Sequence, residues 1–310
     1  MNTLARICLM AFCALPALSV AAPMGYSVNS DQSPGDQLHL IDLETGQSTV
    51  RGTVFTGAKD NRDVEGLAFD RNGTLWAVDE WEFMLFPIQP LNGVGDDSRD
   101  KPIGGLEFRS GNDFGMTFTC DDELFISSVA AQKLYRLSTD TGMAVEVGDL
   151  GARIGALAAW GKNPTQLYGL GVGQYGDPPV VGNRSLYLID TDTGAAELVG
   201  ELGSEAAPYF EGGLSFDEEG QLWAITDRYP LGNQVFTLDL ITGKATLVST
   251  TVASGFESLA IAGPGGCEPP PLAPRGALNS IPTIDAAGRA LATLLLLLTG
   301  LAVLRRGRLL

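Results

Sequence analysis

The sequence predicts an all-β protein, a five-bladed β-propeller, because two short sequence phrases recur along the chain. The phrase Leu-Tyr-Leu-Ile-Asp-Thr-Asp-Thr-Gly at 186–194 recurs so that its final glycine falls at positions 46, 93, 142, 194 and 243. A second phrase alternates with it, at 65–79 and 212–227 in its best copies. A fixed period of about 50 residues indicates a repeat architecture. Four short strands of alternating polarity in each unit are typical of propeller blades.

The ends of the repeat region predict how the ring closes. The last unit stops after its first strand, at 259–262, whereas the chain begins with 25–30, which resembles the missing second strand. We therefore expect the N-terminal strand to complete the last blade beside 259–262, because this removes an open sheet edge. The propeller domain is expected to span 23–264. A β-sandwich is the alternative architecture, although sandwiches rarely repeat their sequence.

The N-terminal segment 1–22 has the plan of a signal peptide. One early charge, Arg6, precedes an apolar run at 7–18, and Val20 and Ala22 occupy the −3 and −1 positions of a cleavage site before Pro23. A short buried helix is the alternative. The prediction is export from the cytoplasm, with the protein periplasmic or on the cell surface.

The C-terminal segment changes composition after Pro264. A linker rich in proline and glycine covers 265–280, and an apolar run at 290–304 is followed by Arg305, Arg306 and Arg308. This pattern predicts a transmembrane helix in 281–310, with the basic cluster cytoplasmic and the propeller outside. A plain membrane anchor is one interpretation, and a sorting signal is the other.

The sorting interpretation depends on Ile281, Pro282, Thr283 and Gly288. Together with the apolar run and the terminal arginines, these residues resemble the IPTL-type C-terminal sorting signal of Gram-negative bacteria, which is associated with exosortase systems. Residues 284–287 depart from the Leu-Ser-Glu-Trp portion of that motif. The resemblance implies a processing protease as a partner, which would release the protein from the membrane.

The net charge of the expected domain limits the classes of molecule that it can bind. Residues 23–264 carry 35 acidic and 14 basic side chains, a net charge of −21. This field repels nucleic acid and favours a cation or a basic partner. Outside the cytoplasm, Cys120 and Cys267 can form a disulfide, but their spacing leaves both the bonded and the free state open.

The expected topology gathers acids on one face of the ring. In a blade, the second-to-third loops and the interblade links share a face, and we expect the two long insertions, 94–112 and 171–184, to lie there. Carboxylates around one channel mouth repel one another unless a cation neutralises them, and such oxygen ligands suit Ca²⁺. A solvated acidic rim is the alternative. The candidate ligands are Asp31, Glu65, Asp79, Asp113, Glu211, Asp227 and Glu257.

The phrases at 65–70 and 73–79 resemble those of calcium-dependent lactonase-type and phytase-like propellers. The resemblance implies that Glu65, at the start of an inner strand, is a metal ligand. His39 is the only histidine, which argues against a Ser-His-Asp triad. We therefore expect a binding or scaffold module, with a calcium-dependent hydrolase as the alternative.

Overall fold

The computed structural model describes residues 22–30, 35–54, 63–106, 113–175, 180–181 and 183–267. The chain divides after Cys267 into two units. The second unit, 268–310, lies outside the described residues, as do Asp31 and residues 1–21 of the expected signal peptide 1–22. The expected transmembrane helix and sorting motif are therefore untested. Within the described part of the chain, no helix has the length and apolar character needed to cross a bilayer.

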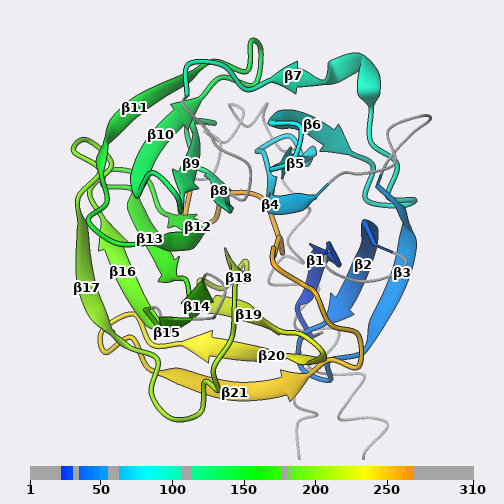
Figure 1. The fold of residues 1–310 in the computed structure, drawn as a ribbon, viewed down its shortest axis with the longest axis vertical. Coiled ribbons are helices and arrows are strands. Elements are labelled where there is room, and N and C mark those ends of the chain that lie inside the picture. The colour runs from blue at the N-terminus through cyan, green and yellow to red at the C-terminus, as the bar shows by residue number, and fades with distance from the viewer. Residues whose placement is uncertain are drawn as a thin grey trace, which may run out of the picture. The chain divides into compact units, whose positions relative to one another are not determined.

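The first unit is a five-bladed β-propeller, as predicted (Figure 1). The sheets follow one another around a ring, and in each complete blade the first strand lies nearest the central axis. The first two blades comprise β4 (Val64–Phe69), β5 (Leu75–Asp79), β6 (Met84–Ile88) and β7 (Lys101–Pro102), then β8 (Phe114–Phe118), β9 (Leu124–Ser128), β10 (Lys133–Leu137) and β11 (Ala144–Asp149).

Two further blades have the same order of strands. They comprise β12 (Ile154–Trp160), β13 (Gln166–Gly171), β16 (Ser185–Ile189) and β17 (Ala196–Glu201), then β18 (Gly212–Phe216), β19 (Leu222–Arg228), β20 (Leu231–Leu238) and β21 (Ala245–Thr250). A small hairpin of β14 (Gln174–Tyr175) and β15 (Val180–Val181) stands in the loop between β13 and β16. Apolar side chains of adjacent blades form the core, for example Phe125 of β9 with Leu157 of β12.

The last blade is shared between the two ends of the propeller, as predicted. It contains β1 (Met24–Val28), β2 (Gln37–Asp42) and β3 (Ser48–Thr53). Residues 256–260, which we call the closing strand, lie along β1 through antiparallel bridges from Tyr26 to Ala260 and from Asn29 to Phe256. Tyr26 and Ala260 exchange backbone hydrogen bonds of 2.7 and 2.9 Å. The ring is therefore closed by hydrogen bonds between distant parts of the chain.

The insertion 94–112 differs from its expected position. Gly95 pairs with Ile88, and β7 pairs with the start of β6, so the blade's fourth strand runs through this segment. A 3₁₀ turn, η1 (Asp97–Arg99), interrupts it. The extra residues therefore lengthen an outer strand, and only the part after β7 connects to the next blade. The insertion 171–184 lies between the second and third strands, where it was expected.

Candidate functional site at the channel mouth

Four of the expected ligands meet where the inner strands begin. Glu65 is the second residue of β4, Asp113 and Glu211 directly precede β8 and β18, and Glu257 lies in the closing strand. Each residue comes from a different blade, so closure of the ring brings together carboxylates that are far apart in sequence. In the remaining blade, the position directly before β12 is Arg153.

The carboxylates form two overlapping groups that share Glu65. One group is Asp63, Glu65 and Glu257, and the other is Glu65, Asp113 and Glu211. Within each group, one oxygen from every side chain lies within 4.8 Å of the others. Glu65 and Glu257 are 6 % and 5 % exposed. Acids this close, and this far removed from water, repel one another strongly unless a proton or a cation lies between them.

The electrostatics of the group follow from this crowding. Burial, and then the charges of Asp113, Asp63 and Glu80, raise the pKa of Glu65 well above its usual range. Burial, and then Asp113 and Glu65, raise the pKa of Glu211 in the same direction. The interaction of Glu65 with the Glu211 side chain offsets part of the rise in the pKa of Glu65, whereas the interaction of Glu211 with Asp113 adds to the rise in the pKa of Glu211.

Glycines form the channel wall directly below the acids. Gly66, Gly115, Gly155 and Gly213 line a narrow neck at this level. A Cβ atom at Gly213 would lie 2.2 Å from the backbone of Ser258, and one at Gly115 would lie 2.8 Å from Ala156. The inner strands can approach this closely only without side chains at these positions. The neck therefore holds the carboxylates at short distances from one another.

Asp79 and Asp227 lie at the same face but have a structural role. Both are fully buried at the ends of β5 and β19. Asp79 Oδ1 accepts backbone hydrogen bonds from Trp81 (2.9 Å) and Glu82 (3.1 Å). Asp227 Oδ1 accepts one from Gly255 (2.8 Å), in the link to the closing strand. These carboxylates shape the loops around the mouth, and neither belongs to the two groups described above.

Asp63 and Glu80 are two acids near the mouth that the sequence did not single out. Asp63 belongs to the group around Glu65 and Glu257, and the charge of Glu80 acts on Glu65. A signal for Asp63 was present, because it lies two positions before Glu65, and residues two apart share a side of an extended chain. Glu80 follows Asp79 in a loop, where sequence alone gives no side-chain direction.

The opposite end of the channel is closed by the segment that follows the closing strand. Cys120 and Cys267 form a disulfide with a Cα–Cα distance of 5.4 Å, which settles the pairing that the sequence left open. Residues 262–265 line a small cavity beneath the neck, together with Phe69, Phe118 and Phe216. The channel is therefore covered at this end, and the acids lie at the other.

Comparisons with known proteins identify no family for the chain. No protein-family model and no curated protein matches it. A virginiamycin B lyase from Staphylococcus aureus is similar in structure, with 15 % identity, a TM-score of 0.41, and coverage of 74 % of this chain and 70 % of that one.

Two other solved structures also resemble this chain, with similarly low sequence identity and TM-scores below 0.5. A streptogramin B lyase has 17 % identity, a TM-score of 0.42, and coverage of 77 % and 72 %. A Bacteroides caccae protein of unknown function has 7 % identity, a TM-score of 0.47, and coverage of 77 % and 98 %. At these values, none of the three says what this chain binds.

Proposed function

We propose that the protein is an exported binding propeller that holds a divalent cation, Ca²⁺, at the acidic channel mouth. The observation that carries the proposal is the convergence of four other carboxylates on Glu65. Hard oxygen ligands at variable spacing suit Ca²⁺, whereas Mg²⁺ demands a stricter octahedral geometry and keeps more of its water. The residues that would hold the ion are Asp63, Glu65, Asp113, Glu211 and Glu257.

Export is supported by the chemistry of the chain. The Cys120–Cys267 disulfide is of a kind that persists in oxidising compartments outside the cytoplasm. The signal-like segment 1–22 and the apolar and basic tail 281–310 agree with this location. In this setting, a bound cation would let the mouth contact an anionic or hydroxyl-bearing ligand that the bare carboxylates would repel.

Calcium titration of the purified protein by calorimetry tests the proposal. We expect saturable binding of one Ca²⁺ at the mouth, with weaker binding of Mg²⁺. Glu65→Gln should abolish binding and at the same time raise the thermal midpoint of the metal-free protein, because it removes repulsion among the acids. A matched control is Glu197→Gln, at an exposed position of β17. Unchanged calcium binding by Glu65→Gln would contradict the proposal.

A calcium-dependent hydrolase is the second candidate. The specific observation in its favour is the position of Glu211 among Asp113 and Glu65, since burial and these charges raise its pKa and a carboxyl that keeps its proton at higher pH can act as a general acid. Turnover of lactones or phosphate esters that depends on both Ca²⁺ and Glu211 would favour the enzyme. If calcium binds but none of these substrates is turned over, the binding module is favoured over the hydrolase.

A further inference from the structure

We propose that the Cys120–Cys267 disulfide is a redox-sensitive clasp that controls the calcium site through the closing strand. The inference rests on the proposed function of the mouth, because Glu257 is both a member of the acidic group and part of that strand. The disulfide lies at one end of the channel and Glu257 at the other, and the ten residues after Glu257 connect them.

The closing strand is held to β1 by few polar contacts. Besides the two hydrogen bonds between Tyr26 and Ala260, Ser27 Oγ donates to the Ser258 carbonyl at 2.5 Å and the Val28 amide donates to Ser258 Oγ at 3.5 Å. Phe256 is fully buried and meets the His39 ring edge to face, with 4.9 Å between the ring centroids. Two hydrogen bonds join this part of the chain to the blade of β18–β21, from Asn233 Nδ2 to the Phe256 carbonyl (2.8 Å) and from the Ile261 amide to Ser215 Oγ (3.1 Å). The strand is therefore held by a small number of noncovalent contacts and by whatever fixes the segment that follows it.

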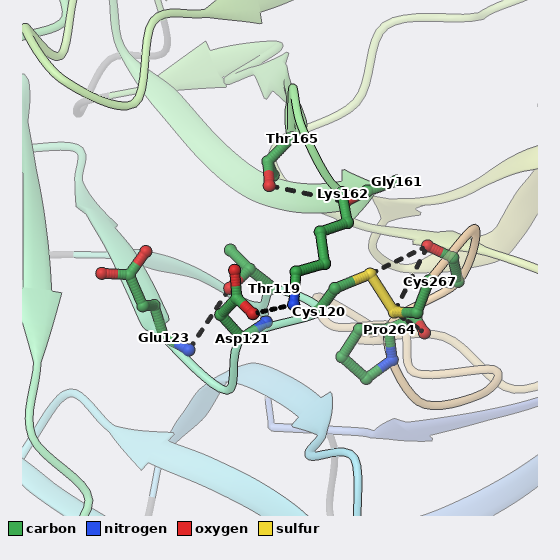
Figure 2. A network of polar contacts seen from close by, with 10 residues as sticks. Thr119, Cys120, Asp121, Glu123, Gly161, Lys162, Thr165, Pro264 and Cys267 are labelled. Carbon is green, nitrogen blue, oxygen red and sulfur yellow. Dashed lines mark hydrogen bonds and ion pairs between the residues drawn. A yellow bond between two sulfur atoms is a disulfide. The ribbon is translucent and has the colours of Figure 1, made fainter. Parts of the chain in front are cut away.

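The segment that follows, residues 262–267, we call the strap. Its Gly265 carbonyl accepts a 2.9 Å hydrogen bond from the Gly161 amide, and Gly265 forms a parallel bridge with Trp160. A Cβ at Gly265 would lie 2.3 Å from the Trp160 ring, so the strap lies directly on this tryptophan. The disulfide then fixes the end of the strap to the turn after β8 (Figure 2).

The anchor of the strap is itself well held. Thr119 Oγ1 accepts backbone hydrogen bonds from Asp121 and Glu123, which shapes the turn around Cys120. Lys162 Nζ lies 2.6 Å from Asp121 Oδ1 and joins this turn to the one after β12 (Figure 2). The disulfide therefore connects the strap to the blade of β8, and the closing strand cannot separate far from β1 while the disulfide is intact.

Reduction would break this connection. A dithiol is the reductant: its thiolate attacks Sγ of Cys267, which is only partly buried, and Cys120 leaves as a thiolate that takes up a proton. The second thiol of the reagent then displaces Cys267, so two protein thiols and one oxidised dithiol result. The strap is left with its backbone hydrogen bond to Gly161 and its packing on Trp160, and the closing strand with Glu257 gains freedom to open.

Hydrogen exchange and calorimetry on the whole protein test the clasp, with dithiothreitol as the dithiol. After reduction, with two free thiols confirmed, we expect amides of peptides covering 23–30 and 253–262 to exchange at least about tenfold faster, while 124–137 is unchanged. We also expect the calcium Kd to rise at least about threefold, because fewer molecules hold Glu257 in place. The pair Cys120→Ser and Cys267→Ser should reproduce both effects.

A matched variant separates the disulfide from its surroundings. Lys162→Gln removes the neighbouring ion pair but keeps the bond, and it should leave both readouts at the oxidised values. Unchanged exchange at 253–262 in fully reduced protein would overturn the clasp, and faster exchange with an unchanged Kd would overturn its control of the site. Absence of calcium binding in both redox states would overturn the proposed function, while the exchange rates still decide whether the clasp holds the strand.

Discussion

Two aspartates of the repeat, Asp70 and Asp217, explain why a tryptophan recurs six residues later. Asp217 Oδ1 accepts hydrogen bonds from the backbone amides of Glu219 (3.1 Å) and Gln221 (2.8 Å), which stabilise the turn between β18 and β19. Its Oδ2 accepts a hydrogen bond from Nε1 of Trp223 at 2.8 Å. Asp70 makes the same contact with Trp76 at 3.1 Å. The carboxylate thus caps the turn and satisfies a buried indole, so the repeat keeps both residues together.

Removal of Asp217 should therefore be costly although the residue is outside the candidate site. We expect Asp217→Ala to lower the free energy of unfolding by about 2–4 kcal/mol, because the Trp223 indole loses its acceptor in a buried position. Urea denaturation measures the change. Asp140→Ala, at an exposed turn position, should change stability by less than about 0.5 kcal/mol, and equal losses in the two variants would refute the role of Asp217.

His39 is a buried histidine that the channel mouth does not use. It is 5 % exposed, and within the described part of the chain neither ring nitrogen has a hydrogen-bond partner. Burial lowers its pKa from 6.5 to about 4. Between these two values, the unfolded chain is protonated at His39 while the folded protein is not. Unfolding therefore takes up a proton, and stability falls as the pH decreases from 6.5 to 4.

His39→Phe should remove this pH dependence while it keeps an aromatic ring against Phe256. We expect the wild type to lose about 2–3 kcal/mol more than the variant between pH 7 and pH 4. Denaturant unfolding at several pH values measures the difference. Glu65 and Glu211 act in the opposite direction, since their raised pKa values favour the folded state as the pH falls. They are present in both proteins, so parallel pH profiles would contradict the assignment to His39.

At the scale of elements, the glycine that ends each repeat joins neighbouring blades. Gly194 has a φ of +78°, and a Cβ on it would lie 2.8 Å from the backbone of Gly148. In turn, a Cβ on Gly148 would lie 2.0 Å from the Thr193 carbonyl oxygen. Gly243 and Gly200 repeat this contact in the next pair of blades. Gly148 and Gly200 both lie beside a bulge in the outer strand, which brings their backbone against the turn.

This contact predicts a difference between two glycines with similar backbone angles. Gly151 has a φ of +71°, but a Cβ on it would meet no atom within 4 Å, so Gly151→Ala should cost only about 1 kcal/mol of backbone strain. Gly194→Ala adds a steric clash with the adjacent blade and should cost about 3 kcal/mol or more. Thermal unfolding of both variants measures the difference. A cost for Gly194→Ala no larger than that for Gly151→Ala would show that the blades do not need this contact.

The repeat made the strands and their order predictable, because alternation and turn residues are local properties of the chain. The path of 94–112 was not predictable in the same way. Its fourth strand is broken by η1 and keeps only the two residues of β7 in regular pairing beside Met84 and Leu85. Such an interrupted strand has no periodic pattern, and its partner strand determines where it lies.

At the scale of the whole molecule, ring closure determines the site. The pairing of Tyr26 with Ala260 could be predicted because the first and last repeats are incomplete in complementary ways. Closure then brings Glu65, Asp113, Glu211 and Glu257 to one mouth. The role of Asp79 and Asp227 as acceptors for loop amides could not be predicted, since an aspartate that caps a turn and one that binds a metal look the same in a sequence. The side-chain direction that separates them is a product of the folded loops.

Calcium binding at the mouth is tested by a crystal structure of the protein grown with Ca²⁺, in which the ion is located by its anomalous scattering. We expect one ion at the channel mouth, with oxygens of Glu65 and at least two other carboxylates of the group at about 2.3–2.6 Å. An occupied site elsewhere on the molecule, or a mouth without an ion at calcium concentrations in the millimolar range, would contradict it.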